Sequence, residues 1–294
     1  MERINICPLC NNSKFEKYLS TKDFFLSQEN FELEKCIKCG LVFTNPKPEE
    51  KELNKYYKSE DYISHSGTKK GITNRIYHIV RNYTIKKKYK TVSNYSNGNK
   101  IIDYGSGAGF LLSYFQKKKW NTLGFEIDKN ARKISLEEHG VKSKNPAEIE
   151  NVKQNSIDAI MMWHVLEHIS DPNHLLRNFH EILKNDGNLF IAVPNIKSYD
   201  ARFYKKFWAA LDVPRHLYHY DHKTIKLLLE KNQFTLHKIK PLIFDSYYIS
   251  ILSGKYSGNK LAFVSGIFLG LISNIFALFR SKNYSSCLYI AKKS

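Results

Sequence analysis

The sequence predicts an α/β protein in which a mostly parallel sheet, covered by helices on both faces, follows a small cysteine-containing unit. Strand and helix patterns alternate from Lys100 onward, as in parallel sheets whose crossovers are helices. Two Cys-x-x-Cys motifs lie near the N-terminus. The 294 residues are 42% hydrophobic and 25% charged, which is typical of a globular protein. We therefore expect an N-terminal unit over residues 1–60, a helical linker over 61–97 and the sheet domain over 98–294.

The N-terminal unit carries two cysteine pairs, Cys7 with Cys10 and Cys36 with Cys39. Two such turns supply the four thiolates of a closed tetrahedral zinc site, which has no open position for a substrate. Five cysteines in the whole chain are too few for a disulfide-stabilised fold. The alternatives are a redox-active dithiol or cysteines that do not meet. We expect a zinc ribbon with a structural metal ion.

The charge balance indicates a preference for anionic partners. Lys and Arg number 46 against 28 Asp and Glu, for a net charge of +18. Nucleic acid, acidic lipid surfaces and phosphorylated substrates all fit such a charge. The N-terminus has no apolar run that resembles a signal peptide, so we expect a cytoplasmic protein.

The sequence of the linker predicts one or two helices over residues 69–90. Apolar residues recur there at helical spacing, at Ile72, Ile76, Ile79, Val80 and Tyr83. We interpret the basic run at residues 86–88 as a solvated face rather than a nucleic-acid patch.

In the sheet domain the sequence predicts a regular series of strands and helices. Strands are expected at 101–104, 122–126, 141–143, 157–163, 188–193, 235–244 and 286–291, and helices at 110–119, 129–139, 172–184 and 224–231. The turn at residues 185–187 should open the strand at 188–193.

A glycine-rich loop follows the first of these strands. It runs from Asp103 through Gly105, Gly107 and Gly109 into a helix, so the backbone can approach a ligand and the helix N-terminus favours an anionic group. Glu126 ends the next strand, where an acidic side chain can bind ribose hydroxyls. A dinucleotide fingerprint would need G-x-G-x-x-G, whereas the spacing here is G-x-G-x-G. The loop therefore suits a carboxylate and a nucleoside better than a pyrophosphate.

These motifs resemble the class I S-adenosylmethionine (SAM)-dependent methyltransferases, especially ubiquinone-pathway and sugar methyltransferases that carry an N-terminal cysteine ribbon. The resemblance spans nearly the whole chain and implies a Rossmann-like seven-stranded sheet. It implies that SAM is held by Asp103, Gly105, Ser106, Gly107, Gly109, Glu126, Ile127, Ala147, Trp163 and His164. The family's Asp that contacts adenine has no counterpart in residues 145–148.

The segment from Trp163 to Pro172 resembles the family's segment beside the cofactor sulfonium. Its H-x-x-E-H letters also fit a zinc-protease pattern. They follow a strand and precede a Ser-Asp-Pro helix start, which disfavours a protease. Related quinone O-methyltransferases have E-x-x-E-H here and use a divalent cation; His164 replaces the first Glu.

Methyl transfer often needs a base that removes the acceptor's proton. The candidates are His216, in a Pro-Arg-His-Leu stretch that the resemblance places in the substrate-facing loop, then His164 and His168. The alternative is that each histidine only satisfies a buried polar contact.

An uncharged apolar segment at 261–279 lies within a predicted helical insertion at about 246–283, before the last strand. Its length would cross a bilayer, but a single span would separate the last strand from the sheet. We expect a buried lid over the substrate site or a hairpin in the membrane interface.

The sequence thus predicts a SAM-dependent methyltransferase acting on oxygen or carbon of a small or lipid-linked metabolite, a sugar or quinone precursor. One alternative is an RNA methyltransferase, disfavoured because the Lys-rich stretches lack interleaved aromatic residues. Another is an inactive methyltransferase-like scaffold with a zinc ribbon.

Overall fold

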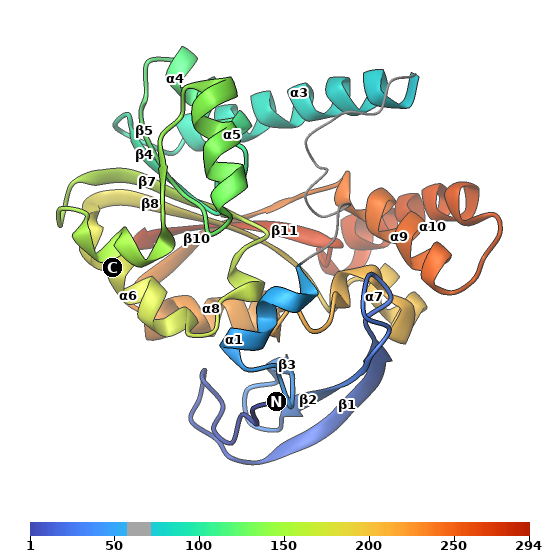
Figure 1. Ribbon diagram of the computed structural model, residues 1–294. Coiled ribbons are helices and arrows are strands. Elements are labelled where there is room, and N and C mark those ends of the chain that lie inside the picture. Colours follow the sequence, from blue (N-terminus) through green and yellow to red (C-terminus); the bar gives the residue numbers. More distant parts are fainter. Residues whose placement is uncertain (58–71) are drawn as a thin grey trace.

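The computed structural model describes residues 1–57 and 72–294, and a seven-stranded sheet with helices on both faces lies at its centre (Figure 1). The strands are β4 (Lys100–Tyr104), β5 (Asn121–Phe125), β6 (Ser143–Lys144), β7 (Ile157–Trp163), β8 (Leu183–Pro194), β10 (Phe234–Pro241) and β11 (Ser286–Lys293). Their order is β10-β11-β8-β7-β4-β5-β6. Strand β11 is antiparallel to both neighbours, whereas the pairs from β8 to β6 are parallel. The predicted Rossmann-like seven-stranded sheet is confirmed.

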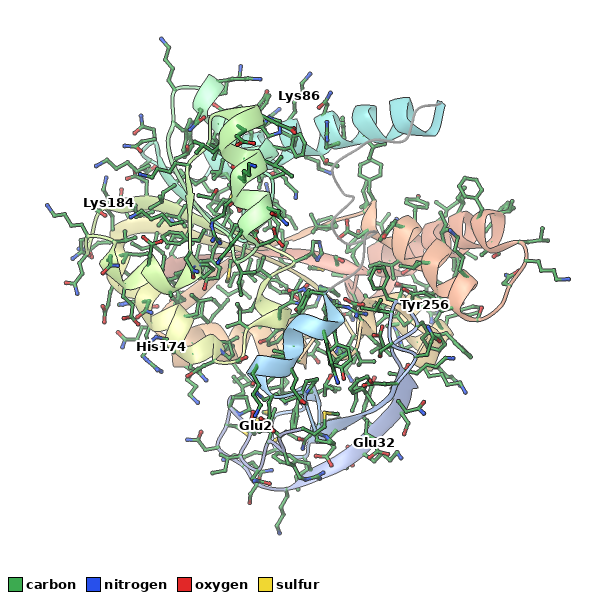
Figure 2. All side chains as sticks on the ribbon, viewed as in Figure 1. Glu2, Glu32, Lys86, His174, Lys184 and Tyr256 are labelled. Carbon is green, nitrogen blue, oxygen red and sulfur yellow. The ribbon has the colours of Figure 1, made fainter. Side chains whose placement is uncertain are left out.

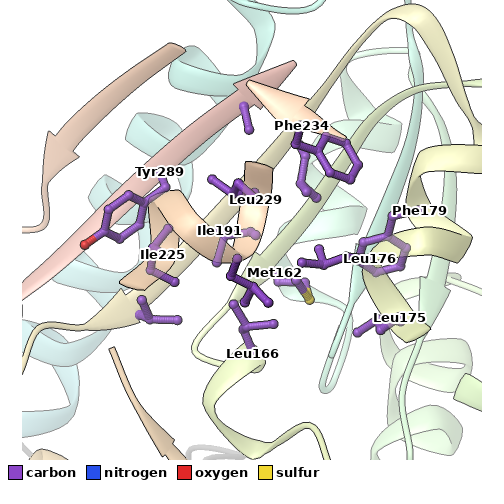
Figure 3. Close-up of a cluster of buried hydrophobic side chains, with 14 of the residues drawn as sticks. Met162, Leu166, Leu175, Leu176, Phe179, Ile191, Ile225, Leu229, Phe234 and Tyr289 are labelled. Carbon is purple, nitrogen blue, oxygen red and sulfur yellow. The ribbon is translucent and has the colours of Figure 1, made fainter. Parts of the chain in front are cut away.

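Helices cover the sheet because successive strand residues point to opposite faces. The helices are α3 (Ile72–Ser93), α4 (Phe110–Lys117), α5 (Lys129–His139), α6 (Pro172–Ile182) and α8 (His222–Lys231). Ile101 and Met161 pack with residues of α3 and α4. Their neighbours Ile102 and Met162 pack with α6 and α8 on the other face, part of which Figure 3 shows.

The linker prediction corresponds to the single helix α3, and residues 69–71 lie outside the described part of the chain. Lys86 and Lys87 are exposed, as expected of a solvated face; Figure 2 labels Lys86. Lys88 differs, because its ammonium lies 4.2 Å from the centre of the Trp163 ring. The prediction of a solvated face is therefore wrong for Lys88.

Strand β8 begins directly after α6 instead of after a separate turn. Its pairing with β7 jumps from Ile157–Leu183 to Ala159–Asn188, so the residues between bulge out of the ladder. The predicted turn at residues 185–187 is this bulge.

The N-terminal residues form strands β1 (Phe15–Lys22), β2 (Asn30–Cys36) and β3 (Val42–Thr44), followed by the short helices α1 (Glu50–Leu53) and η1 (Asn54–Tyr56). A fourth strand, β9 (Tyr218–His219), comes from the sheet domain and pairs with β3. The Pro8 carbonyl accepts hydrogen bonds from Asn173 on α6 and Lys231 on α8, at 2.9 and 2.7 Å. The ribbon is therefore attached to the sheet domain at several points.

Two helical segments interrupt the second half of the sheet. Between β8 and β9 lie α7 (Tyr199–Tyr204), η4 (Lys205–Phe207) and η5 (Ala209–Leu211). Between β10 and β11 lie α9 (Asp245–Tyr256), α10 (Ala262–Phe276) and η6 (Ala277–Ser281). Among the described residues, one helical stretch, Ala262–Arg280, is long and apolar enough to cross a membrane. Its large apolar side chains are mostly exposed, so the interpretation of a buried lid is wrong.

Candidate cofactor and acceptor site

The residues that the resemblance assigns to SAM all lie at one edge of the sheet. Asp103 ends β4, Glu126 follows β5, Ala147 lies in the short helix η2 (Pro146–Asn151) after β6, and Trp163 ends β7. These strands are parallel, so their carboxyl ends meet at the same edge. Ligands of open α/β sheets bind at this edge.

The glycine loop is held against β5 and leaves one face of its backbone open. The amides of Gly105 and Ser106 both donate to the Phe125 carbonyl, at 2.7 and 3.0 Å. A Cβ on Gly105 would lie 2.3 Å from Val165, and one on Gly109 would lie 2.2 Å from the Ser135 hydroxyl. Packing therefore requires glycine at both positions.

Gly107 is constrained differently. Its φ is +52°, and a Cβ there would meet no atom within 4 Å. Open space beside a glycine at the tip of the loop is where a ligand can contact the backbone. This geometry fits the nucleoside-binding loop that the sequence indicates.

Glu126 links the loop to the following strand. Its carboxylate accepts a hydrogen bond from the Gly107 amide at 2.8 Å and another from the Asp128 amide at 2.9 Å. The side chain is half-buried, which leaves carboxylate lone pairs available to a ligand. This position is appropriate for binding ribose hydroxyls.

Asp103 lies beneath the loop and is only 4% exposed. Burial raises the pKa of its carboxyl group to about 8, against the opposing charge of Lys88. Burial likewise lowers the pKa of the Lys88 ammonium. A cation from α3 therefore neighbours Asp103 and Trp163, in the region assigned to the positively charged part of the cofactor.

The remaining predicted cofactor contacts differ in burial. Ile127 is 76% exposed, and Ala147 is exposed within η2. Ser106 is buried, and its hydroxyl lies 2.9 Å from that of Ser143. The structure places no predicted cofactor residue away from this edge.

His164 lies between two carboxylates. Its Nε2 is 3.1 Å from Asp245 on α9 and its Nδ1 is 3.5 Å from Glu167. Burial opposes a charged ring, but the two carboxylates outweigh it and raise the pKa of His164 to about 10. A pKa this high favours the protonated ring at neutral pH, which disfavours His164 as the base among the three histidines that the sequence suggests. The sequence had not indicated Asp245, which lies 81 positions further along the chain in a different element.

His168 and His216 have different surroundings. Their ring centres are 4.6 Å apart, and their Nδ1 atoms lie 3.0 Å from the Arg215 carbonyl and 2.9 Å from the Ala210 carbonyl, respectively. Burial and the neighbouring His216 lower the pKa of His168 to about 4. Each ring can donate from Nδ1 to its carbonyl, which leaves Nε2 as a proton acceptor.

Glu167 completes this histidine group. Its carboxylate is 1% exposed and accepts no hydrogen bond within the described residues, although His164 lies at ion-pair distance. Donor atoms of Glu167, His168 and His216 lie within 4.8 Å of one another, a spacing that a metal ion can bridge. His164 stands where the quinone methyltransferases have the first Glu of their pattern, and it is not one of these three residues.

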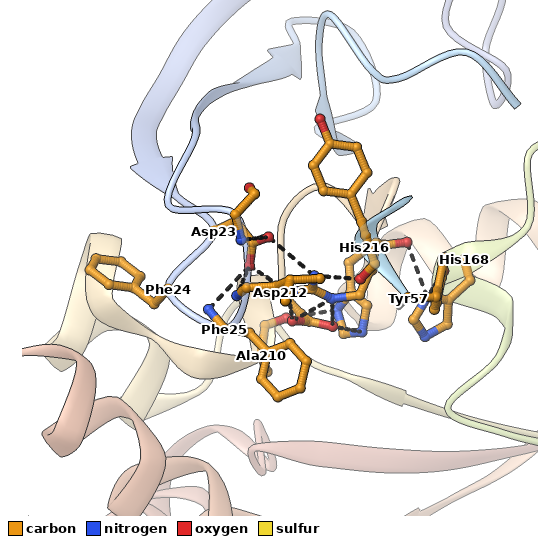
Figure 4. A network of polar contacts seen from close by, with 12 residues as sticks. Asp23, Phe24, Phe25, Tyr57, His168, Ala210, Asp212 and His216 are labelled. Atoms are coloured by element: carbon orange, nitrogen blue, oxygen red, sulfur yellow. Dashed lines mark hydrogen bonds and ion pairs between the residues drawn. The ribbon is translucent and has the colours of Figure 1, made fainter. Parts of the chain in front are cut away.

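A buried ion-pair network connects the ribbon to the loop that carries His216 (Figure 4). The guanidinium of Arg215, 1% exposed, is 2.8 Å from Asp23 in the turn after β1 and 2.6 Å from Asp212. Asp23 also accepts amide hydrogen bonds from three residues of its own turn. Sequence reasoning missed this network, because Asp23 and Arg215 are far apart in the chain.

The four ribbon cysteines converge on one point. The Sγ atoms of Cys7 and Cys39 are 3.6 Å apart, and those of Cys10 and Cys36 are 3.5 Å apart. All four sulfur atoms lie within 4.8 Å of one another. Zinc–sulfur bonds of about 2.3 Å in a tetrahedron require sulfur–sulfur distances of about 3.8 Å. The arrangement fits a four-cysteine zinc site and excludes cysteines that do not meet.

Curated relatives match part of the chain. Ubiquinone biosynthesis O-methyltransferase from Actinobacillus pleuropneumoniae is 30% identical over an alignment of 115 residues, and the match covers 35% of this chain and 49% of the relative. The enzyme of the same name from Aliivibrio fischeri is 28% identical over an alignment of 112 residues, and the match covers 35% of this chain and 47% of the relative. The chain spans about half the length of the curated relatives it matches.

Solved structures support the fold. Magnesium protoporphyrin IX methyltransferase from Synechocystis, with S-adenosylhomocysteine bound, matches with a TM-score of 0.54 and 11% identity over 84% of this chain and all of that one. Geranyl diphosphate C-methyltransferase from Streptomyces coelicolor matches with a TM-score of 0.51 and 11% identity over 81% and 87%.

The family model for the methyltransferase domain matches residues 77–239, more than half of the chain. That span includes the glycine loop, Glu126 and the histidine segment described above. With this match, the sheet order and the open glycine loop in agreement, the chain belongs to the class I SAM-dependent methyltransferases.

Proposed function

We propose that the protein transfers a methyl group from SAM to an oxygen or carbon of a small or lipid-linked metabolite, a sugar or quinone precursor. The observation that carries this proposal is the glycine loop, whose Gly107 faces open space while Glu126 holds its amide. An inactive scaffold would not need this arrangement. The two curated relatives described above are O-methyltransferases of ubiquinone biosynthesis, which favours oxygen as the methylated atom.

The residues proposed to hold SAM are those predicted from the sequence: Asp103, Gly105, Ser106, Gly107, Gly109, Glu126, Ile127, Ala147, Trp163 and His164. SAM, when bound, supplies the methyl group. Glu126 would bind the ribose, and the loop amides would bind the carboxylate. The ammonium of Lys88 now lies on the face of Trp163 and interacts with Asp103. It would have to move away when SAM binds, because the cationic part of SAM would occupy the same region.

We propose His168 and His216 as the groups that accept the acceptor's proton. The Nδ1 atom of each ring lies within hydrogen-bonding distance of a backbone carbonyl, and burial lowers the pKa of His168 to about 4, so its ring is neutral at physiological pH. His164 would instead act as a fixed cation beside the reacting centre, oriented by Asp245. Alignment of the two reactants would contribute most of the acceleration.

We further propose that Cys7, Cys10, Cys36 and Cys39 bind a structural zinc ion. The chain then divides as the sequence predicts, into a zinc ribbon (1–60), a helical linker (61–97) and a methyltransferase domain (98–294). We expect the protein to act in the cytoplasm on a small-molecule acceptor rather than on nucleic acid.

Calorimetric titration with SAM and S-adenosylhomocysteine tests the proposal. The variant is Gly107→Ala, and its matched control is Gly140→Ala at the end of α5. Both glycines have positive φ and no atom within 4 Å of an added Cβ, so both substitutions should cost about 1 kcal/mol of stability. Only Gly107→Ala should weaken SAM binding, by tenfold or more. Absence of binding to the zinc-loaded wild type would favour the inactive scaffold.

A further inference from the structure

The helical hairpin of α9 and α10 presents large apolar side chains to the outside. Phe263, Phe268 and Phe279 are 66%, 62% and 78% exposed. We call the following exposed set the apolar face: Leu261, Phe263, Val264, Ile267, Phe268, Leu271, Ile272, Ile275, Phe276, Leu278 and Phe279. No charged residue lies between Lys260 and Arg280. An exposed apolar surface this continuous marks an interaction site.

The contact between the two helices is made by small residues. A Cβ on Gly266 would lie 2.5 Å from the Ile251 Cα, and one on Gly270 would lie 2.8 Å from the Tyr247 Cα. Ser250 and Ser273 are also fully buried, and the Ser273 hydroxyl donates to Asp200 on α7.

This packing is the reverse of that expected in water, where a helix buries its large apolar residues. Helices surrounded by lipid pack through glycine and serine and turn their large apolar residues outward. The hairpin has the second arrangement.

We propose that the apolar face docks on the surface of an anionic lipid bilayer. Exposed cations flank it at both ends, Lys255 and Lys260 at the tip of the hairpin and Arg280 and Lys282 at its base. Acidic headgroups attract such cations while the apolar side chains enter the acyl boundary. A second copy of the chain is a poorer partner, because it would bring another net charge of +18 to the same contact.

The hairpin lies on the bilayer and does not cross it. It begins after β10 and ends before β11, and these strands pair with each other down to Pro241 and Cys287. Both ends of the insertion are therefore tied to one edge of the sheet. The tip between α9 and α10 carries exposed Lys255, Asn259 and Lys260, which disfavours insertion into hydrocarbon.

Docking would bring the predicted site to the lipid surface. Asp245, the first residue of α9, holds His164 at 3.1 Å, so the base of the hairpin adjoins the histidine group. This step rests on the proposed function: an acceptor resident in the membrane could reach the site without leaving the bilayer.

Vesicle flotation of the full chain tests the docking. Wild-type protein should bind vesicles of phosphatidylcholine with about 30% phosphatidylglycerol at least about tenfold more tightly than vesicles of phosphatidylcholine alone. Phe263→Glu and Phe268→Glu should each weaken that binding by about tenfold or more. Leu136→Glu is the matched control, because Leu136 is 57% exposed on α5, outside the apolar face, and this variant should bind like the wild type.

Two outcomes would overturn the proposal. One is that the wild type binds neither the anionic vesicles nor the vesicles of phosphatidylcholine alone. The other is a dimer in sedimentation that Phe268→Glu dissociates, which would assign the apolar face to a second copy. Calorimetric SAM binding should be unchanged in all three variants. Vesicle binding without SAM binding would reject the proposed function and leave the docking intact.

Discussion

Replacement of Asp23 by Asn tests whether the ribbon is part of the structure that positions His216. Arg215 is 1% exposed and relies on Asp23 and Asp212 for its counter-charges. Breaking a buried ion pair by removing one partner costs about 3–5 kcal/mol, because the other charge stays buried. Asp212 remains in Asp23→Asn, so we expect the lower end, about 3 kcal/mol.

Urea denaturation at neutral pH measures this cost. The slope of unfolding free energy against urea concentration should be the same in both proteins, since a changed slope would indicate a loss of two-state behaviour. Glu32→Gln is the control: Glu32, labelled in Figure 2, is also a ribbon carboxylate with a cation, Lys17, at 2.7 Å, but both side chains are largely exposed. Exposed pairs contribute little, so this variant should unfold like the wild type. Equal stability of the two variants would refute the reasoning that Arg215 depends on the ribbon.

The difference in unfolding free energy between wild type and Asp23→Asn should change with pH in a direction that the pKa of Asp23 determines. Burial would raise the pKa of Asp23, but hydrogen bonds from Arg215 and Ser27 outweigh it and lower the pKa below its usual value of 3.8. The stability that the Asp23 charge contributes is therefore present above pH 3.8 and lost as the pH falls through the folded-state pKa. The gap between wild type and Asp23→Asn should narrow only in strong acid.

Two further predictions concern metal content and His164. Mass spectrometry of purified protein should find one zinc ion per chain. The zinc should be lost in Cys36→Ser and retained in Glu167→Gln. A second metal ion per chain that is lost only in Glu167→Gln would be assigned to Glu167, His168 and His216. His164→Gln should destabilise the protein at pH 7. Because the pKa of His164 is raised to about 10, its contribution is complete below pH 6.5 and lost as pH rises through 10, so the difference from wild type in urea should shrink at pH 10.5. A difference independent of pH would contradict the charged state of His164.

The cofactor loop could be predicted from sequence because its constraints are local. Gly105 and Gly109 have positive φ in the tight turn between one strand and the helix that follows it, and Glu126 follows the adjacent strand. Parallel topology then places these residues together without further information. The same holds for the cysteine pairs, since each pair sits in one tight turn.

The contacts that define the acceptor side could not be predicted in this way. Hydrophobic periodicity indicates that a residue is buried but not which distant residue it meets. The pairing of Asp23 with Arg215, of Asp245 with His164 and of Lys88 with Trp163 all depend on tertiary packing. The apolar segment shows the same limit, because composition alone does not reveal that its glycines face α9 and its phenylalanines face outward.

These contacts meet at one segment, residues 163–168, at the end of β7. Trp163 contacts Lys88 from α3, His164 contacts Asp245 from the hairpin, and His168 lies within hydrogen-bonding distance of Tyr57 and of the Arg215 carbonyl. Helix α3, the hairpin, the N-terminal region and the loop that carries Arg215 therefore all reach this segment. Since the solved structures are similar in the sheet at only 11% identity, their acceptors do not transfer to this chain. We therefore expect the ribbon, α3 and the hairpin to shape the acceptor site, and the proposed docking of the hairpin on lipid makes amphiphilic molecules the first acceptors to test.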